Sequence, residues 1–174
     1  MHDRTRTCVM MLTAAGAIAL SAWAGPFLQQ RAGPSDSDRS LAGLKRVEVI
    51  VEELPPQFRN VGVTAELLRT IIANDLEAAG HEIIETKRVA KLGVQVSAVT
   101  DSYVPGGIAY SVNMVLYQTV KIERLDQALF VPTHNQVILG LEVKHNLSES
   151  LKTTVRSLTR EWVEVAQLVT EERH

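Results

Sequence analysis

A long alternation of apolar and polar side chains limits the fold more than any other feature of this chain. Apolar residues occupy the even positions from Ile108 to Ile122, and only Gln118 interrupts them. A period of two predicts a β-strand, because successive side chains on a strand point to opposite faces of the sheet. At about 3.3 Å per residue this strand would span roughly 50 Å, so we expect it to bend or to contain a bulge.

Four further segments have strand patterns. Valines at 47, 49 and 51 begin the first, residues 82–85 form a short second, and alternation over 91–98 predicts a third that runs to a turn at residues 105–107. The last predicted strand, 137–143, follows a predicted loop through Pro132, Thr133, His134 and Asn135. Turns, not helices, join the later strands, which favours an antiparallel meander.

Two amphipathic helices complete the pattern. The first is expected to begin at Thr64 and to end at Gly80, and the second is expected to begin at Asn146. Glu149 follows Asn146 by three residues, which predicts a capping box. The second helix carries an apolar stripe of Leu151, Val155, Leu158, Trp162, Val165 and Val169. We therefore expect an α+β fold: a two-layer sandwich with a mostly antiparallel sheet of about four to five strands and two helices on one face, in the order β-α-β-β-β-β-α.

The amino terminus has the pattern of an export signal. Arg4 and Arg6 precede an apolar run, and the sequence Ala22-Trp23-Ala24 fits a signal peptidase site. We expect a signal peptide at 1–24, a flexible leader at 25–40 and a single α/β domain at 41–174, which would be periplasmic or secreted after cleavage between Ala24 and Gly25. The alternative is an inner-membrane anchor formed by residues 9–24, although this run is shorter than the roughly 20 residues that usually cross a bilayer.

Composition and charge limit the kinds of function that we expect of this chain. The chain has 18 basic and 20 acidic residues, a weak and mixed charge that gives no footprint for nucleic acid or an anionic membrane. Contact with a membrane is expected only if the amino-terminal segment is retained as an anchor. The single cysteine, Cys8, would leave with the signal peptide, and the sequence contains none of the common nucleophile, metal or phosphate-loop motifs. We therefore expect no cofactor, no metal and no enzymatic activity.

Two groups of residues are candidates for a binding site. His134 and Asn135 lie in the predicted loop, a position where function is often found, although a solvated imidazole explains His134 equally simply. Lys152, Arg156 and Arg160 recur every four residues on the polar side of the second helix, where they would form a basic stripe that meets a partner or is simply solvated. An alternative site for a small apolar ligand would be lined by Tyr110, Met114 and Trp162, which would equally fill a dry core.

One stretch of the sequence resembles known envelope domains. A strand at 47–51, a helix that ends in Leu76-Glu77-Ala78-Ala79-Gly80 and a short strand from Glu82 resemble the opening of the TolB amino-terminal domain, the LpoB and CsgG group, and LptE. The shared order of elements covers about residues 41–170. These families imply non-enzymatic work, in which a domain binds a partner protein or assists envelope assembly or transport. This chain lacks the lipid-anchor cysteine of the lipoprotein members, and no residue-level binding motif is shared.

These observations favour an exported, non-catalytic envelope domain that binds a partner protein, through an exposed sheet edge or the outer face of the last helix. A periplasmic carrier or sensor of a small apolar ligand is the alternative. An unrecognised enzyme is the third hypothesis.

Overall fold

The computed structural model describes residues 33–86, 89–100 and 106–172. Within that part of the chain, five strands form one open sheet in the order β2-β1-β3-β4-β5. The strands are β1 (Arg46–Val51), β2 (Glu82–Ile83), β3 (Ala90–Thr100), β4 (Gly107–Ile122) and β5 (Gln127–Val143). The helices are α2 (Asp36–Arg39), α3 (Pro56–Arg59), α4 (Ala65–Ala78) and α5 (Leu147–Glu171), and a short 3₁₀ turn, η2 (Glu123–Leu125), joins β4 to β5.

The sheet is mixed. β3, β4 and β5 form the antiparallel meander that the sequence predicts, whereas β1 lies parallel to both β2 and β3. The meander predicted for the later strands is confirmed, and the parallel pairing of β1 was not predicted. The parallel arrangement of β1 and β2 arises because α4 connects them, and parallel neighbours need a crossover of this kind.

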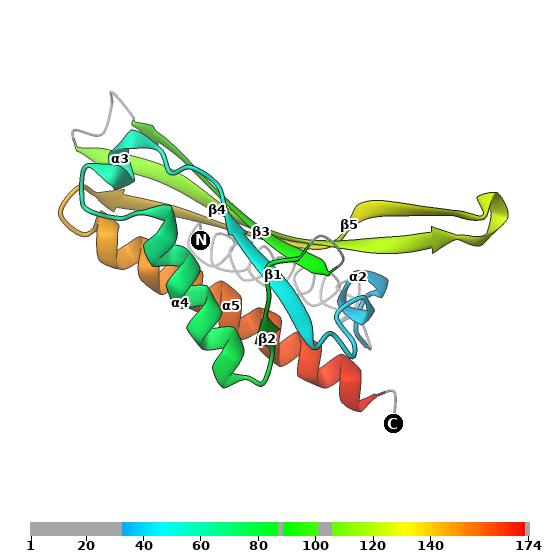
Figure 1. The fold of residues 1–174 in the computed structure, drawn as a ribbon. Helices are drawn as coiled ribbons and strands as arrows, with labels where there is room; N and C mark the ends of the chain where they lie inside the picture. Colours follow the sequence, from blue (N-terminus) through cyan, green and yellow to red (C-terminus); the bar gives the residue numbers. More distant parts are fainter. Residues whose placement is uncertain (1–32, 87–88, 101–105, 173–174) are drawn as a thin grey trace, which may run out of the picture. The chain divides into compact units, whose positions relative to one another are not determined.

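Helices α4 and α5 cover one face of the sheet, which confirms the two-layer sandwich (Figure 1). We call this the inner face. Its side chains from β4 are all buried: Ile108, Tyr110, Val112, Met114 and Leu116. They meet the buried stripe of α5, whose largest member is Trp162, fully shielded from solvent. Val165, predicted to belong to that stripe, lies at its margin and is only partly buried, while Ala166 takes the core position.

The two long helices begin differently. Thr64 caps α4, and its hydroxyl accepts a hydrogen bond from the amide of Leu67 at 3.1 Å. Asn146 is the N-cap residue of α5 but makes no side-chain capping bond, so the predicted capping box is wrong. Its expected second member, Glu149, instead accepts a 2.7 Å hydrogen bond from Lys152. Among the helices of the described residues, none is both long and apolar enough to cross a bilayer.

The predicted irregularity of the long strand is confirmed. Leu116 pairs with His134 and Tyr117 pairs with Pro132, so Thr133 is an extra residue in β5 and forms a bulge. The loop predicted at residues 132–135 is wrong, because these residues lie inside β5, which begins at Gln127. The sequence showed only the second half of this strand.

Helix α2 stabilises the bulge. Its first turn is closed by a capping box between Ser35 and Asp38. The carbonyl of Thr133 accepts hydrogen bonds from the hydroxyls of Ser37 at 3.0 Å and Ser40 at 3.3 Å. These bonds satisfy a carbonyl that the bulge removes from the strand ladder. Because α2 falls within the predicted leader at 25–40, the last residues of that segment belong to the folded unit; residues 1–32, which contain the predicted signal peptide, lie outside the described residues.

Candidate functional site: an uncovered apolar edge strand

The apolar side chains of the second half of β5 point away from the helices. Leu139 is 78% exposed, Leu141 63%, Val137 52% and Val143 37%. We call these four residues the outward strip. Their partners on β4 are small or polar residues such as Ala109, Ser111 and Asn113, which cover little of the strip. β5 is also the last strand of the sheet, so its second backbone edge has no strand partner among the described residues.

Tyr110 shows why β5 adopts this orientation. Its ring lies over Gly140 on the inner face, where an added Cβ atom would stand 2.3 Å from the ring carbon Cζ. The Tyr110 hydroxyl makes hydrogen bonds with Ser150 at 2.7 Å and Thr154 at 3.1 Å, which join β4 to α5. The inner face of β5 thus needs a glycine at this point, and the alternation of the strand then places Leu139 and Leu141 outward.

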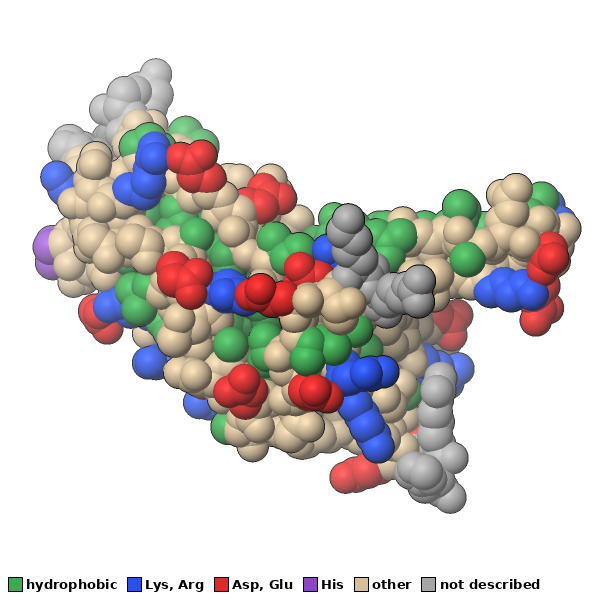
Figure 2. All heavy atoms as spheres, in the orientation of Figure 1, with side chains coloured by type: hydrophobic (Ala, Val, Ile, Leu, Met, Phe, Trp, Pro, Cys, Tyr) green, Lys and Arg blue, Asp and Glu red, His purple; other side chains and the backbone are tan. Residues whose placement is uncertain are grey.

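Beyond the bulge, β4 and β5 continue as an arm, residues 117–132 with the connecting turn. Figure 1 shows this arm projecting past α2 and away from α4 and α5. Tyr117 and Phe130 stack on one of its faces with ring centroids 5.8 Å apart. Other apolar side chains are exposed, and Figure 2 shows hydrophobic groups along the arm with charged groups gathered at its tip. The exposed members include Val120, Leu125 and Leu129.

The structure places His134, a predicted site residue, in β5 with its side chain only 5% exposed. Its ring atom Nδ1 lies 3.3 Å from the Ser37 hydroxyl and 3.6 Å from a carboxylate oxygen of Asp38. Burial lowers the pKa of His134, while the charges of Asp38 and Glu161 and a backbone contact at Ser37 oppose that shift. The second predicted residue, Asn135, is exposed on the opposite face of the strand. The two residues line an open pocket of about 440 Å³ together with Ser37, Tyr117 and Pro132.

This serine, histidine and aspartate do not have the geometry of a catalytic triad. In a triad, one ring nitrogen takes the proton of the nucleophile and the other donates to the carboxylate. Here Ser37 and Asp38 both approach Nδ1, and within the described part of the chain the buried Nε2 atom has no hydrogen-bond partner. The cluster instead joins α2 to the bulge of β5.

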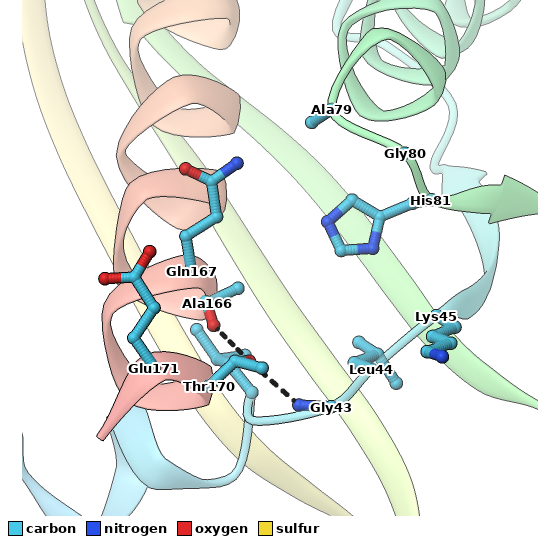
Figure 3. Close-up of a pocket in the computed structure, with 11 residues that line it drawn as sticks. Gly43, Leu44, Lys45, Ala79, Gly80, His81, Ala166, Gln167, Thr170 and Glu171 are labelled. Atoms are coloured by element: carbon cyan, nitrogen blue, oxygen red, sulfur yellow. Dashed lines mark hydrogen bonds between the residues drawn. The ribbon is translucent and has the colours of Figure 1, made fainter. Parts of the chain in front are cut away.

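A second pocket, of about 260 Å³, lies between the end of α4 and the last turns of α5 (Figure 3). His81 faces it, with the centroid of its ring 5.2 Å from that of Trp162. Burial lowers the pKa of His81, and a backbone hydrogen bond at Leu44 partly opposes this shift. On the opposite wall, the Thr170 hydroxyl accepts from the Gly43 amide at 3.0 Å and donates to the Ala166 carbonyl at 2.6 Å. The bond from the Gly43 amide holds the segment before β1 against α5.

The predicted basic residues Lys152, Arg156 and Arg160 all lie on α5 and differ in their surroundings. Lys152 is partly buried and pairs with Glu149, while Arg156 is exposed. Arg160 and Asp75 both line a pocket of about 170 Å³ between α4 and α5. Among the described residues there is no group of three or more histidine, cysteine or acidic side chains suited to a metal ion.

Sequence reasoning found the strand that carries the outward strip but did not find the direction of its side chains. The signal that was available is Gly140, because a glycine in the middle of an apolar strand indicates close approach by another group. Helix α2 was not predicted from the sequence either. The available signal is Ser35, a cap residue that is followed three positions later by the acidic residue Asp38.

No protein-family profile matches this chain, and no curated protein matches it by sequence. Solved structures that match this chain include a minor lipoprotein from Acinetobacter baumannii, at 10% identity and a TM-score of 0.41; the match covers 75% of this chain and 95% of that protein. A hypothetical protein from Chlamydia trachomatis has 10% identity and a TM-score of 0.43, with 72% and 97% covered. Rare lipoprotein B from Shewanella oneidensis has 11% identity and a TM-score of 0.26, with 74% and 93% covered. Similarity at this level assigns neither a family nor a function to this chain.

Proposed function

We propose that this protein is an exported, non-catalytic domain of the cell envelope that binds a partner protein through β5. The observation that carries the proposal is the outward strip, four aliphatic side chains exposed beside a strand edge that has no strand partner among the residues that the structure describes. An open edge offers backbone amides and carbonyls to an added strand, and alternating apolar side chains give such an added strand its specificity. Export is supported by the signal-like pattern of residues 1–24.

Beside the strip, the edge has little of the usual protection against unwanted pairing. Natural edge strands are commonly blocked by charged residues, by proline or by covering segments. From Gln127 to Leu141 the strand contains no lysine, arginine, aspartate or glutamate, and its one proline, Pro132, lies before the strip. Glu142 lies within the span of the strip but on the inner face, so the outward side chains of the strip are uncharged, which fits a surface that is covered in the working state of the protein.

The alternative of an apolar ligand is less well supported. Its expected cavity residues are buried in the sandwich: Tyr110 contacts Phe58 edge to face at 5.6 Å, and Trp162 contacts His81. Met114 is fully shielded from solvent in the same core cluster. These side chains fill the space that a ligand would need.

A photoreactive amino acid placed in the native host tests the proposal. We expect position 139 to form adducts with an envelope protein, because its side chain is the most exposed of the strip. The matched control is Gln95, which is exposed on the same side of the sheet but lies on β3, away from the edge. Arg156, an exposed residue of the predicted basic stripe on α5, is a second control. Adducts from Gln95 or Arg156 that equal those from 139, or no adducts at all from the strip, would contradict the assignment to β5.

The export component has its own test. Cell fractionation with sequencing of the amino terminus should recover protein that begins near Gly25 outside the cytoplasm. Intact protein that begins at Met1 and is free in the cytosol would contradict export.

A further inference from the structure

We infer that the partner of β5 is a second copy of this chain, paired edge to edge with antiparallel β5 strands about a two-fold axis at Gly140. This inference rests on the proposed function of the strip. It is carried by the order of the residues along β5, which is complementary to itself when the strand is reversed.

The complementarity depends on the register. With the axis at Gly140, Leu139 lies opposite Leu141 of the second copy, and Val137 lies opposite Val143. Each member of the strip then meets another aliphatic side chain on the same face, and such directly opposed pairs are what stabilises a sheet. In a two-fold interface each contact occurs twice, so four residues supply the whole apolar ladder.

Neighbouring registers are worse. A shift by one residue would set outward side chains of one copy against inward side chains of the other, such as Gln136 and Glu142. A shift by two residues in one direction would leave Val143 opposite Asn135, and in the other direction would leave Val137 opposite His145. Only the register centred on Gly140 matches all four aliphatic residues.

The distribution of charge also favours a second copy. When two identical strands pair about a two-fold axis, residues close to the axis lie near their own copies, and like charges that are directly opposed are destabilising. The strand has no acidic or basic residue between Gln127 and Leu141. The nearest charges, Glu142 and Lys144, would lie opposite Ile138 and Gln136 of the second copy, so no charged residue meets its own kind.

The paired segment has natural limits. β5 ends at Val143 on one side, and on the other side the bulge at Thr133 and the missing amide of Pro132 interrupt the edge. Pairing of two segments of this length would bury less surface than the about 800 Å² per partner that typical stable interfaces bury. We therefore expect reversible self-association at micromolar or higher concentration.

Disulfide trapping of the full chain tests both the partner and the register. Cys8, the one native cysteine, is replaced by Ser in every variant. Chains with Leu139→Cys are mixed with chains with Leu141→Cys and oxidised gently. Directly opposite residues have Cα atoms about 4.5 to 5.5 Å apart, whereas positions offset by two are about 7 to 8 Å apart, near the limit for a disulfide. The mixture should form a covalent dimer at least several-fold faster than either variant alone.

The wild-type protein provides a second, independent readout. Sedimentation velocity should show a concentration-dependent dimer, and Leu139→Asp should remove it while circular dichroism and thermal unfolding show a folded chain. A wild-type chain that remains a monomer at several hundred micromolar, or equal trapping by all cysteine combinations, would overturn the inference. If adducts from position 139 in cells contain a different envelope protein and the purified chain stays monomeric, the proposed function stands and the second copy is excluded. If the strip gives neither self-association nor adducts, both fail.

Discussion

Strands β4 and β5 lie side by side, and both alternate apolar and polar residues, yet the apolar sets face opposite directions. The even residues of β4 from Ile108 to Leu116 point to the helices and are buried, whereas the odd residues of β5 from Val137 to Val143 point away from them and are exposed. Opposite the buried residues of β4, β5 places Gln136, Ile138, Gly140 and Glu142. The difference teaches that alternation identifies a strand, but the packing of the neighbouring strand decides which of its faces is in the core.

The strongest test of this comparison replaces one leucine on each strand. Leu116→Ala removes a side chain that is fully shielded beneath the helices, and we expect a loss of about 2 to 5 kcal/mol in the free energy of unfolding. Leu139→Ala removes a side chain that is 78% exposed, and we expect a change within about 0.5 kcal/mol. Urea unfolding at low protein concentration, where self-association is negligible, measures both. Similar losses for the two variants would show that the outer face is covered within one chain.

A second pair of variants tests what holds the inner face of β5. Gly140→Ala would put a Cβ atom 2.3 Å from Cζ of Tyr110, so the ring must move and its hydrogen bonds to α5 must weaken. We expect a loss of about 1 to 3 kcal/mol, as for other overpacked cores. Gly93→Ala is the control, because its Cβ atom would meet Cε2 of Tyr117 at 3.4 Å on the outer face. Gly140→Ala that is no worse than Gly93→Ala would show that the close contact with Tyr110 does not constrain the strand.

The two helices that cover the inner face allow a smaller comparison. Thr64→Ala removes the side chain that accepts from the Leu67 amide, and should cost about 1 kcal/mol. Asn146→Ala removes a side chain that makes no capping bond, so its cost should stay below about 0.5 kcal/mol. Thermal and chemical unfolding of both variants check the difference. Equal costs would indicate that Asn146 stabilises α5 in solution by a bond that the structure lacks.

The smallest effect concerns pH and the two histidines at the rim of the core. Burial lowers the pKa of His81 and of His134 from the ordinary value of 6.5. The unfolded chain therefore binds these protons more readily, so stability is highest above 6.5 and falls as the pH drops below that value towards the lower pKa of the folded state. Unfolding at pH 7.5 and pH 5 measures the slope, and His81→Gln with His134→Gln should reduce it. A slope unchanged in the double variant would assign the pH dependence to other groups.

The sequence allowed the prediction of the sandwich and both long helices, because these rest on local periodicity. An irregularity was expected from the length of β4, but the extra residue lies in β5. It did not predict the parallel pairing of β1, which depends on where the α4 crossover returns in space. The start of β5 was missed because the extra residue Thr133 breaks the alternation and Pro132 resembles a loop residue. For the candidate site, His134 and Asn135 were predicted to lie in a loop, and His134 is instead buried in β5 by contacts with α2 that are distant in sequence. The outward strip was recognised as a strand, but its exposure depends on Tyr110 and could not be read from β5 alone.

The bulge at Thr133 also reverses the parity of β5. From 135 to 143 the odd-numbered residues face outward, whereas beyond the bulge Phe130 and Pro132 share the face of Tyr117. Deletion of Thr133 would place Pro132 next to His134 and restore a regular alternation, with Pro132 still opposite Tyr117. The two faces of the arm would stay aligned with those of the sandwich, and the deletion would instead remove the carbonyl to which Ser37 and Ser40 of the α2 region donate.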